Sequence, residues 1–132
     1  LIPIFGWYLK KIGSISIKRG QITKDNLGFY DEISNVLNSS DRPLIIFPQG
    51  TRVLPNERPP FKKGASRIYE KLKIACQPVA INSGYVWPKT GRKISNKTIT
   101  ISILQRINND LEKETFLKTL EDKIYSELNL IN

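Results

Sequence analysis

The chain has 132 residues, of which 21 are basic and 12 acidic; its net charge is +9, and it holds one cysteine and no histidine. This length fits one domain, and no apolar run is long enough to span a bilayer. A lone cysteine, Cys76, excludes a disulfide framework, and the missing histidine excludes Ser-His or Cys-His catalysis and any His-ligated metal within this chain. We therefore expect no metal site, and a buried core thiol at Cys76.

The positive charge is concentrated in two stretches. Residues 1–24 and 84–106 each contain five basic residues and no acid, whereas residues 110–127 contain six acids and three lysines. Loops and strand ends, rather than the last helix, therefore carry the positive charge. Three kinds of partner fit this distribution, namely nucleic acid, an anionic membrane surface and a phosphorylated small molecule.

The first part of the chain alternates between predicted helix and strand. Apolar side chains at helical spacing predict a short amphipathic helix over residues 3–12. Its Trp7 and Tyr8 lie beside lysines, which suits a membrane interface as well as packing against the domain. Alternating Ile and Ser residues predict a strand over residues 15–17, and helical spacing returns over residues 23–37.

A change of chemistry marks the middle of the chain. Residues 44–47 are an unbroken apolar run rich in β-branched residues, which predicts a buried strand that stops at Pro48. Gly50 then allows close approach to the backbone, Thr51 offers a hydroxyl, and Arg52 offers a fork of donors that matches a phosphate or carboxylate. This stretch is therefore a candidate anion site, and the alternative is a turn with a surface arginine.

The second part of the chain continues the alternation. A proline-rich loop over residues 53–63 leads to a predicted helix over residues 65–74. Strands follow over residues 78–81 and, after a basic loop, over residues 97–104. The apolar stripe of the last predicted helix, over residues 110–128, consists of Leu117, Leu120, Ile124 and Leu128.

This order of elements predicts an α/β fold with a mainly parallel sheet flanked by helices. Parallel strands place their carboxyl ends at one edge of the sheet, where ligands bind in open α/β folds. Arg19, Arg52 and the Asn82-Ser83 pair each follow or end a predicted strand, so they are expected to converge there. Two arginines at one edge predict a phosphate site.

Four blocks of sequence resemble the motifs of the 1-acylglycerol-3-phosphate acyltransferase family, in the family's order. They are Pro3–Trp7, Gly13–Arg19, Phe47–Arg52 and Pro78–Gly84. The third is the most specific, because Phe-Pro-Gln-Gly-Thr-Arg differs by one residue from the family's usual Phe-Pro-Glu-Gly-Thr-Arg. The resemblance implies that residues 1–132 are a single, partial acyltransferase domain, the C-terminal part of a glycerol-3-phosphate acyltransferase-like fold.

The resemblance also implies an activity and a set of site residues. The family transfers an acyl group from acyl-CoA or acyl carrier protein to lysophosphatidic acid, which gives phosphatidic acid for phospholipid biosynthesis, and no cofactor is implied. Arg19 and Arg52 would hold the glycerol phosphate, and Gly50 and Thr51 would shape its pocket. Three further motif residues would support them, namely Phe47, Pro48 and Gln49.

Two departures from the family pattern affect the expected activity. Gln49 replaces a glutamate, which keeps the shape and an acceptor oxygen but removes the charge. The family's His-x4-Asp motif, which supplies the general base, is absent. Since the chain also opens at Leu1 in an apolar run without methionine, we expect a fragment of a longer reading frame with no catalytic residue of its own, which binds phosphate without turnover.

The expected partners are lysophosphatidic acid, the acyl donor and a membrane surface. The resemblance implies membrane association at the cytoplasmic face of the inner membrane. Three alternatives remain open, namely an acyltransferase for glycerol 3-phosphate or another lysolipid, a non-catalytic protein that binds lipid phosphate, and a nucleic-acid-binding module. Only the charge supports the last, because no nucleic-acid motif or stacking platform is present; we therefore expect no nucleic-acid partner.

Overall fold

The computed structural model describes residues 3–15, 26–89 and 91–131. They divide into two compact units, Leu1–Leu44 and Ile45–Asn132. The interpretation of the whole chain as one partial domain stays a prediction.

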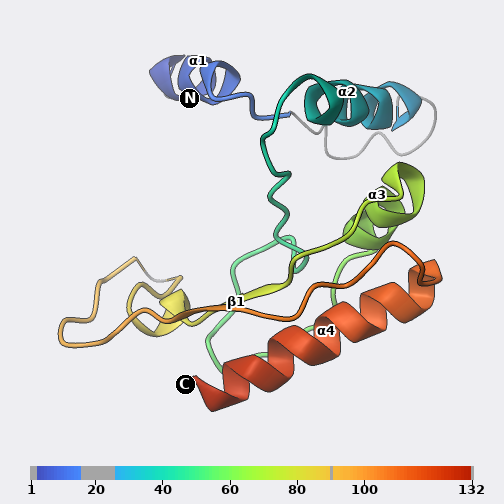
Figure 1. The fold of residues 1–132 in the computed structure, drawn as a ribbon. Helices are drawn as coiled ribbons and strands as arrows, with labels where there is room; N and C mark the ends of the chain where they lie inside the picture. The colour runs from blue at the N-terminus through green and yellow to red at the C-terminus, as the bar shows by residue number, and fades with distance from the viewer. Residues whose placement is uncertain (1–2, 16–25, 90, 132) are drawn as a thin grey trace. The chain divides into compact units, whose positions relative to one another are not determined.

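The first unit contains two helices, α1 (Pro3–Lys11) and α2 (Asn26–Ser39) (Figure 1). They confirm the helices predicted over residues 3–12 and 23–37. Gly13 ends α1 with a positive φ of 77°, a conformation that glycine adopts without strain at a helix C-terminus. The predicted strand over residues 15–17 and the candidate residue Arg19 lie outside the described residues.

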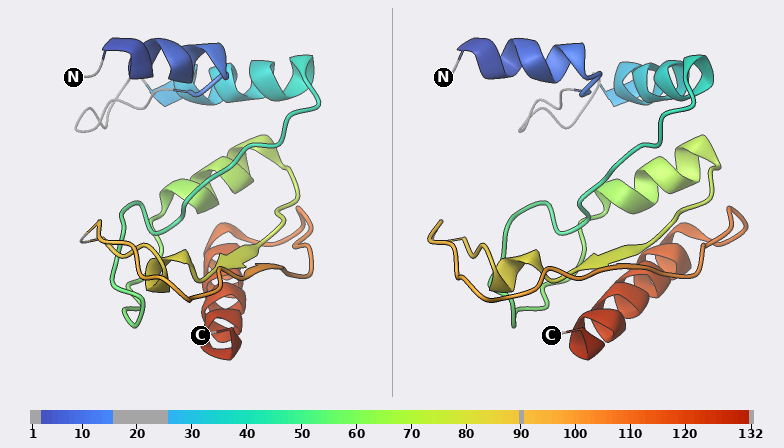
Figure 2. Two further views of the ribbon diagram at one scale, coloured as in Figure 1. Left: turned by 90° about the vertical axis from the view of Figure 1, so that its left-hand side faces the viewer. Right: turned by 60° about the vertical axis from the view of Figure 1, so that its left-hand side comes forward.

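The second unit contains two longer helices and a small sheet. Its elements are α3 (Gly64–Leu72), β1 (Val79–Ile81), the 3₁₀ turn η1 (Ser83–Tyr85), β2 (Ile101–Ile103) and α4 (Lys113–Leu130). The helix α4 packs against both α3 and β1, and Figure 2 shows from two further sides that it lies alongside the strands. These elements confirm the predicted helices over residues 65–74 and 110–128 and the predicted strands over residues 78–81 and 97–104, with shifted ends.

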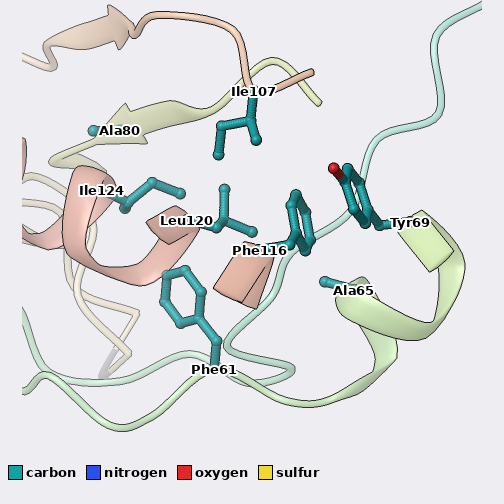
Figure 3. Packing of buried hydrophobic residues seen from close by; sticks show 8 residues of the cluster. All are labelled: Phe61, Ala65, Tyr69, Ala80, Ile107, Phe116, Leu120 and Ile124. Atoms are coloured by element: carbon teal, nitrogen blue, oxygen red, sulfur yellow. The ribbon is translucent and has the colours of Figure 1, made fainter. Parts of the chain in front are cut away.

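The core of the second unit lies between α3, α4 and one face of the sheet. Eight buried side chains form it (Figure 3): Phe61, Ala65, Tyr69, Ala80, Ile107, Phe116, Leu120 and Ile124. The rings of Tyr69 and Phe116 stack with their centroids 3.7 Å apart. The Tyr69 hydroxyl donates to the carbonyl of Asn108 and accepts from the N–H of Leu111, so this buried polar group has partners on both sides.

The prediction of a mainly parallel sheet is not confirmed. The strand pair that the structure describes is antiparallel, with Val79 opposite Ile103 and Ile81 opposite Ile101. A parallel pair needs a crossover connection, usually a helix, whereas antiparallel strands can be joined by a loop. The described residues between β1 and β2 form only the short turn η1 and irregular loop, which suits the antiparallel arrangement.

The predicted strand over residues 44–47 is also absent from the described residues. The backbone of this segment joins no sheet there, and the side chains of Ile45 and Phe47 are 76% and 78% exposed. An apolar run becomes a buried strand only where neighbouring strands pair with it and other elements cover both of its faces. The part of the chain that the structure describes provides neither for this segment.

Candidate functional site

The candidate motif Phe47–Arg52 begins with a tight turn. The N–H of Gly50 donates to the carbonyl of Phe47 at 3.0 Å, and Gly50 has a φ of 71°. A side chain at this position would be strained by the backbone conformation, and its Cβ would lie 3.2 Å from Cγ of Lys62. Glycine therefore fits this position for two reasons, namely its backbone conformation and the closeness of the Lys62 side chain.

Two backbone hydrogen bonds connect the turn to the rest of the second unit. The N–H of Lys62 donates to the carbonyl of Pro48 at 2.8 Å. The neighbouring N–H, that of Phe61, donates to a carboxylate oxygen of Glu121 on α4 at 2.6 Å. The segment that follows the proline-rich loop therefore holds the turn on one side and α4 on the other.

A side-chain hydrogen bond links the motif to α4 directly. Nε2 of Gln49 donates to the hydroxyl of Tyr125 at 3.3 Å, and that hydroxyl donates its own proton to the carbonyl of Pro59. An amide suits this chain of bonds because it brings a proton of its own, which leaves the tyrosine proton for Pro59. An ionised glutamate would have to take the tyrosine proton instead. The amide at position 49 thus matches its surroundings.

Arg58 connects the proline-rich loop to Tyr125 and to α4. Its guanidinium carbon lies 5.5 Å from the centre of the Tyr125 ring. One terminal nitrogen donates to the carbonyl of Pro55 at 2.6 Å and the other to Oδ1 of Asn129 at 3.2 Å. These contacts occupy both terminal nitrogens of the guanidinium with groups of its own unit, so Arg58 has a structural role.

The two residues that end the motif are exposed. The side chains of Thr51 and Arg52 face solvent, and the ion pairs in the described part of the chain join Lys113 to Glu70 and Glu114, away from Arg52. The motif is therefore anchored through Pro48 and Gln49, and the groups suited to an anion remain accessible. The roles of Arg19, Gly50, Thr51 and Arg52 in phosphate binding stay predictions.

Asn82, which was expected near the anion site, is occupied elsewhere. Its Nδ2 donates to the carbonyl of Ile131 at 2.8 Å, and its Oδ1 accepts from the N–H of Thr100 at 2.7 Å. The side chain is buried, and it connects the end of β1 to the segment before β2 and to the end of α4. Asn82 therefore holds the fold together rather than offering free donors.

Asn82→Ala should lower the free energy of unfolding by ~2 kcal/mol, because two partly buried backbone groups lose their hydrogen-bond partner. Chemical denaturation followed by circular dichroism measures this change. The matched control is Asn56→Ala, at an exposed position whose side chain makes no hydrogen bond with the described residues. Equal stability of the two variants would contradict the structural role of Asn82.

Tyr125→Phe should cost about 1–2 kcal/mol of stability, because it removes the bonds to Gln49 and Pro59. Burial raises the pKa of Tyr125 above its ordinary value of 10.0; the hydrogen bond from Gln49 and the charge of Arg58 oppose this rise, and nearby Glu121 adds to it. A pKa raised on folding favours the protonated native state, so this stabilisation is complete below pH 10.0 and is lost as the pH rises through the folded pKa.

Denaturant titrations between pH 7 and about pH 11 test this expectation. The stability difference between the wild type and Tyr125→Phe should shrink above pH 10.0. The control is Tyr85→Phe, whose hydroxyl makes no hydrogen bond with the described residues, so its stability at pH 7 should stay close to that of the wild type. A difference for Tyr125→Phe that stays constant across this range would argue against the bonded hydroxyl.

Cys76 is half-buried against the core, and burial raises the pKa of its thiol, so it is a poor nucleophile at neutral pH.

Two further features concern metal binding and the membrane. Within the described ranges, no group of potential ligands is arranged to hold a metal ion. None of the helices described has both the length and the apolar character required to cross a bilayer.

Sequence reasoning found the motif but missed the residues that anchor it. Tyr125 lies 76 residues after Gln49, and Glu121 lies 60 residues after Phe61. No local pattern links such positions. The only available signal was a tyrosine beside the apolar stripe of the last predicted helix, because a partly buried tyrosine usually finds a partner for its hydroxyl.

The chain is similar to known acyltransferases, in agreement with the motif at Phe47–Arg52. The family described as Acyltransferase matches residues 1–82. The chain is 31% identical over 130 residues to a 1-acyl-sn-glycerol-3-phosphate acyltransferase of Helicobacter pylori, covering 96% of this chain and 53% of the relative. It is 28% identical over 133 residues to the protein of the same name from Streptococcus pneumoniae, covering 98% of this chain and 46% of the relative.

A third relative extends the range of organisms. The 1-acyl-sn-glycerol-3-phosphate acyltransferase of Pseudomonas aeruginosa is 30% identical over 90 residues, which cover 68% of this chain and 35% of that protein. The chain therefore spans about half the length, or less, of these curated relatives. No solved structure matches it.

Proposed function

This chain belongs to the acyltransferase family, and on that premise we propose that it is the phosphate-binding part of a 1-acyl-sn-glycerol-3-phosphate acyltransferase. The complete protein would transfer an acyl group from acyl-CoA or acyl carrier protein to lysophosphatidic acid and so make phosphatidic acid. It would need no cofactor beyond the acyl donor, and it would work at the cytoplasmic face of the inner membrane. The names of its relatives support this choice of substrate.

The observation that carries the proposal is the anchored turn at Phe47–Arg52. The N–H of Lys62 holds the backbone carbonyl of Pro48, and the side-chain amide of Gln49 bonds to Tyr125, so the turn is anchored through two neighbouring residues. The next residues, Thr51 and Arg52, are exposed. A fixed turn that ends in an accessible hydroxyl and guanidinium is suited to a phosphate monoester, because the donors need little reorganisation when the ligand binds.

In the proposed reaction, the free hydroxyl of the acceptor attacks the thioester carbonyl of the donor. The carbon–sulfur bond breaks, the thiolate leaves, and the proton of the hydroxyl passes to a general base. Arg19 and Arg52 would hold the glycerol phosphate, and Thr51 would donate to one of its oxygens. Because the 132 residues contain no histidine, a histidine base would have to lie outside them.

Acyl-transfer assays of the complete open reading frame that contains this chain test the proposal. We expect turnover with lysophosphatidic acid and acyl-CoA or acyl carrier protein, and binding of lysophosphatidic acid without turnover by the 132-residue chain. A panel of acceptors that includes glycerol 3-phosphate and other lysolipids identifies the head group. The proposal fails if the chain alone is as active as the complete reading frame, or if the complete protein prefers another acceptor.

A further inference from the structure

A second set of exposed residues lies far from the candidate motif in the sequence, between β1 and β2. We call this set the basic loop surface, and it consists of Trp87, Lys89, Arg92, Lys93, Ile94 and Lys97. Trp87 is 57% exposed and Ile94 is 46% exposed, and the four cations are exposed as well. Figure 1 shows that the segment extends beyond the end of the two strands. Large apolar side chains and cations therefore share a projecting loop.

Backbone hydrogen bonds give this loop a defined shape. The N–H of Trp87 donates to the carbonyl of Ser83 at 2.8 Å, and the N–H of Ile94 donates to the carbonyl of Val86 at 2.8 Å. Between them, the N–H of Gly91 donates to the carbonyl of Pro88 at 2.9 Å, with a φ of 81° at Gly91. Trp87 thus follows a hydrogen-bonded turn directly, and its side chain is exposed in the described fold.

The charge around Trp87 has one sign. No acidic residue lies between Glu70 and Asp110 in the sequence. Nζ of Lys93 lies 4.9 Å from the centre of the Trp87 ring, a cation–π distance. The ion pairs of the described residues join Lys113 to Glu70 and Glu114 and involve no cation of the basic loop surface.

We propose that the basic loop surface binds an anionic lipid bilayer. The indole ring of Trp87 and the side chain of Ile94 would enter the interface, and the lysines and Arg92 would contact lipid phosphates. Charge complementarity supports this partner. Nucleic acid has the same charge, but it binds through aromatic platforms and basic grooves, whereas here a branched aliphatic side chain accompanies a single tryptophan.

This inference rests on the proposed function in one respect: the proposed acceptor, lysophosphatidic acid, is a membrane lipid. Its test measures vesicle binding without acyl transfer, so the two proposals can fail separately. The first measurement is co-sedimentation of the 132-residue chain with vesicles of equimolar phosphatidylglycerol and phosphatidylcholine. The variant replaces Arg92, Lys93 and Lys97 by glutamine. Each charge near an anionic surface changes affinity roughly five-fold, so we expect the triple variant to bind about a hundred-fold more weakly.

The matched control replaces three exposed cations on helices by glutamine, namely Arg67, Lys71 and Lys118. It makes the same change in net charge, and we expect less than about a five-fold loss of vesicle binding, since only a loss at the loop removes direct contacts. Equal losses for the two triple variants would overturn the proposal, because they would show attraction by net charge alone. Circular dichroism checks that both variants keep the helix content of the wild type.

The second measurement follows Trp87 itself. In the background of Trp7→Phe, Trp87 is the only tryptophan. We expect its emission to shift to the blue on addition of the anionic vesicles, and lipids with brominated acyl chains to quench it. The proposal is overturned if the emission does not change with vesicles, or if a DNA duplex of mixed sequence changes it and the vesicles do not.

Discussion

Arg52→Ala should lower kcat/KM for lysophosphatidic acid in the complete acyltransferase by roughly 10- to 150-fold. The estimate corresponds to one charge-assisted hydrogen bond, worth ~1.5–3 kcal/mol. Arg52 is exposed at the end of a turn that Lys62 and Tyr125 hold in place, so the substitution removes the donor and leaves the turn intact. Initial rates over a range of acceptor concentrations, at constant acyl donor, measure the change.

Two further variants make the result for Arg52 specific. Arg52→Lys keeps the charge but loses the planar fork, so its loss should be intermediate. Arg67→Ala removes an exposed arginine from α3 and should leave kcat/KM within about two-fold, in line with the small effects of most surface substitutions. If Arg52→Ala also stays within two-fold, Arg52 does not bind the phosphate.

Phe116→Ala should lower the free energy of unfolding by about 3–5 kcal/mol. Phe116 is 2% exposed, and its ring stacks on that of Tyr69 with 3.7 Å between the centroids. Figure 3 shows the two rings side by side. The substitution therefore leaves a cavity between α3 and α4 and removes an aromatic contact. Since a domain is stabilised by only about 5–15 kcal/mol in total, this change removes a large share.

Phe47→Ala is the matched control for this loss of stability. It makes the same chemical change at a side chain that is 78% exposed, so its effect on unfolding should stay within about 0.5 kcal/mol. Urea denaturation followed at 222 nm measures both variants. A large loss of stability for Phe47→Ala would contradict the structure, because it would place that ring in a core.

The helices were predictable because their apolar side chains recur at helical spacing. The face of the last helix that packs against the core was not predictable in the same way. The sequence suggests a stripe through Leu117, Leu120, Ile124 and Leu128, whereas the most buried residues of α4 are Phe116, Leu120 and Ile124. Because Phe116 and Leu117 are adjacent and both apolar, the helical periodicity alone fits a buried face that contains either of them. The stacking partner Tyr69 on α3 selects Phe116.

The strands show a different limit. The alternation over residues 97–104 indicates a strand, but pairing covers only Ile101–Ile103, opposite the three residues of β1. Strand length depends on the partner, which local sequence does not contain. The apolar run at residues 44–47 looks like a buried strand by composition, yet its burial requires pairing that the described residues do not supply.

The candidate site divides in the same way. The amino-acid sequence alone establishes the chemistry of Phe47–Arg52 and the absence of a histidine base within these 132 residues, because residue types carry that information. The requirement for glycine at position 50 follows from its positive φ and the closeness of Lys62, which the structure shows. Three-dimensional contacts were needed to show that Gln49 bonds to Tyr125, that Arg58 and Asn82 stabilise the fold, and that Trp87 lies exposed among cations. Three of these hydrogen bonds, Gln49–Tyr125, Arg58–Asn129 and Asn82–Ile131, join positions at least 49 residues apart in the chain, which no local pattern connects.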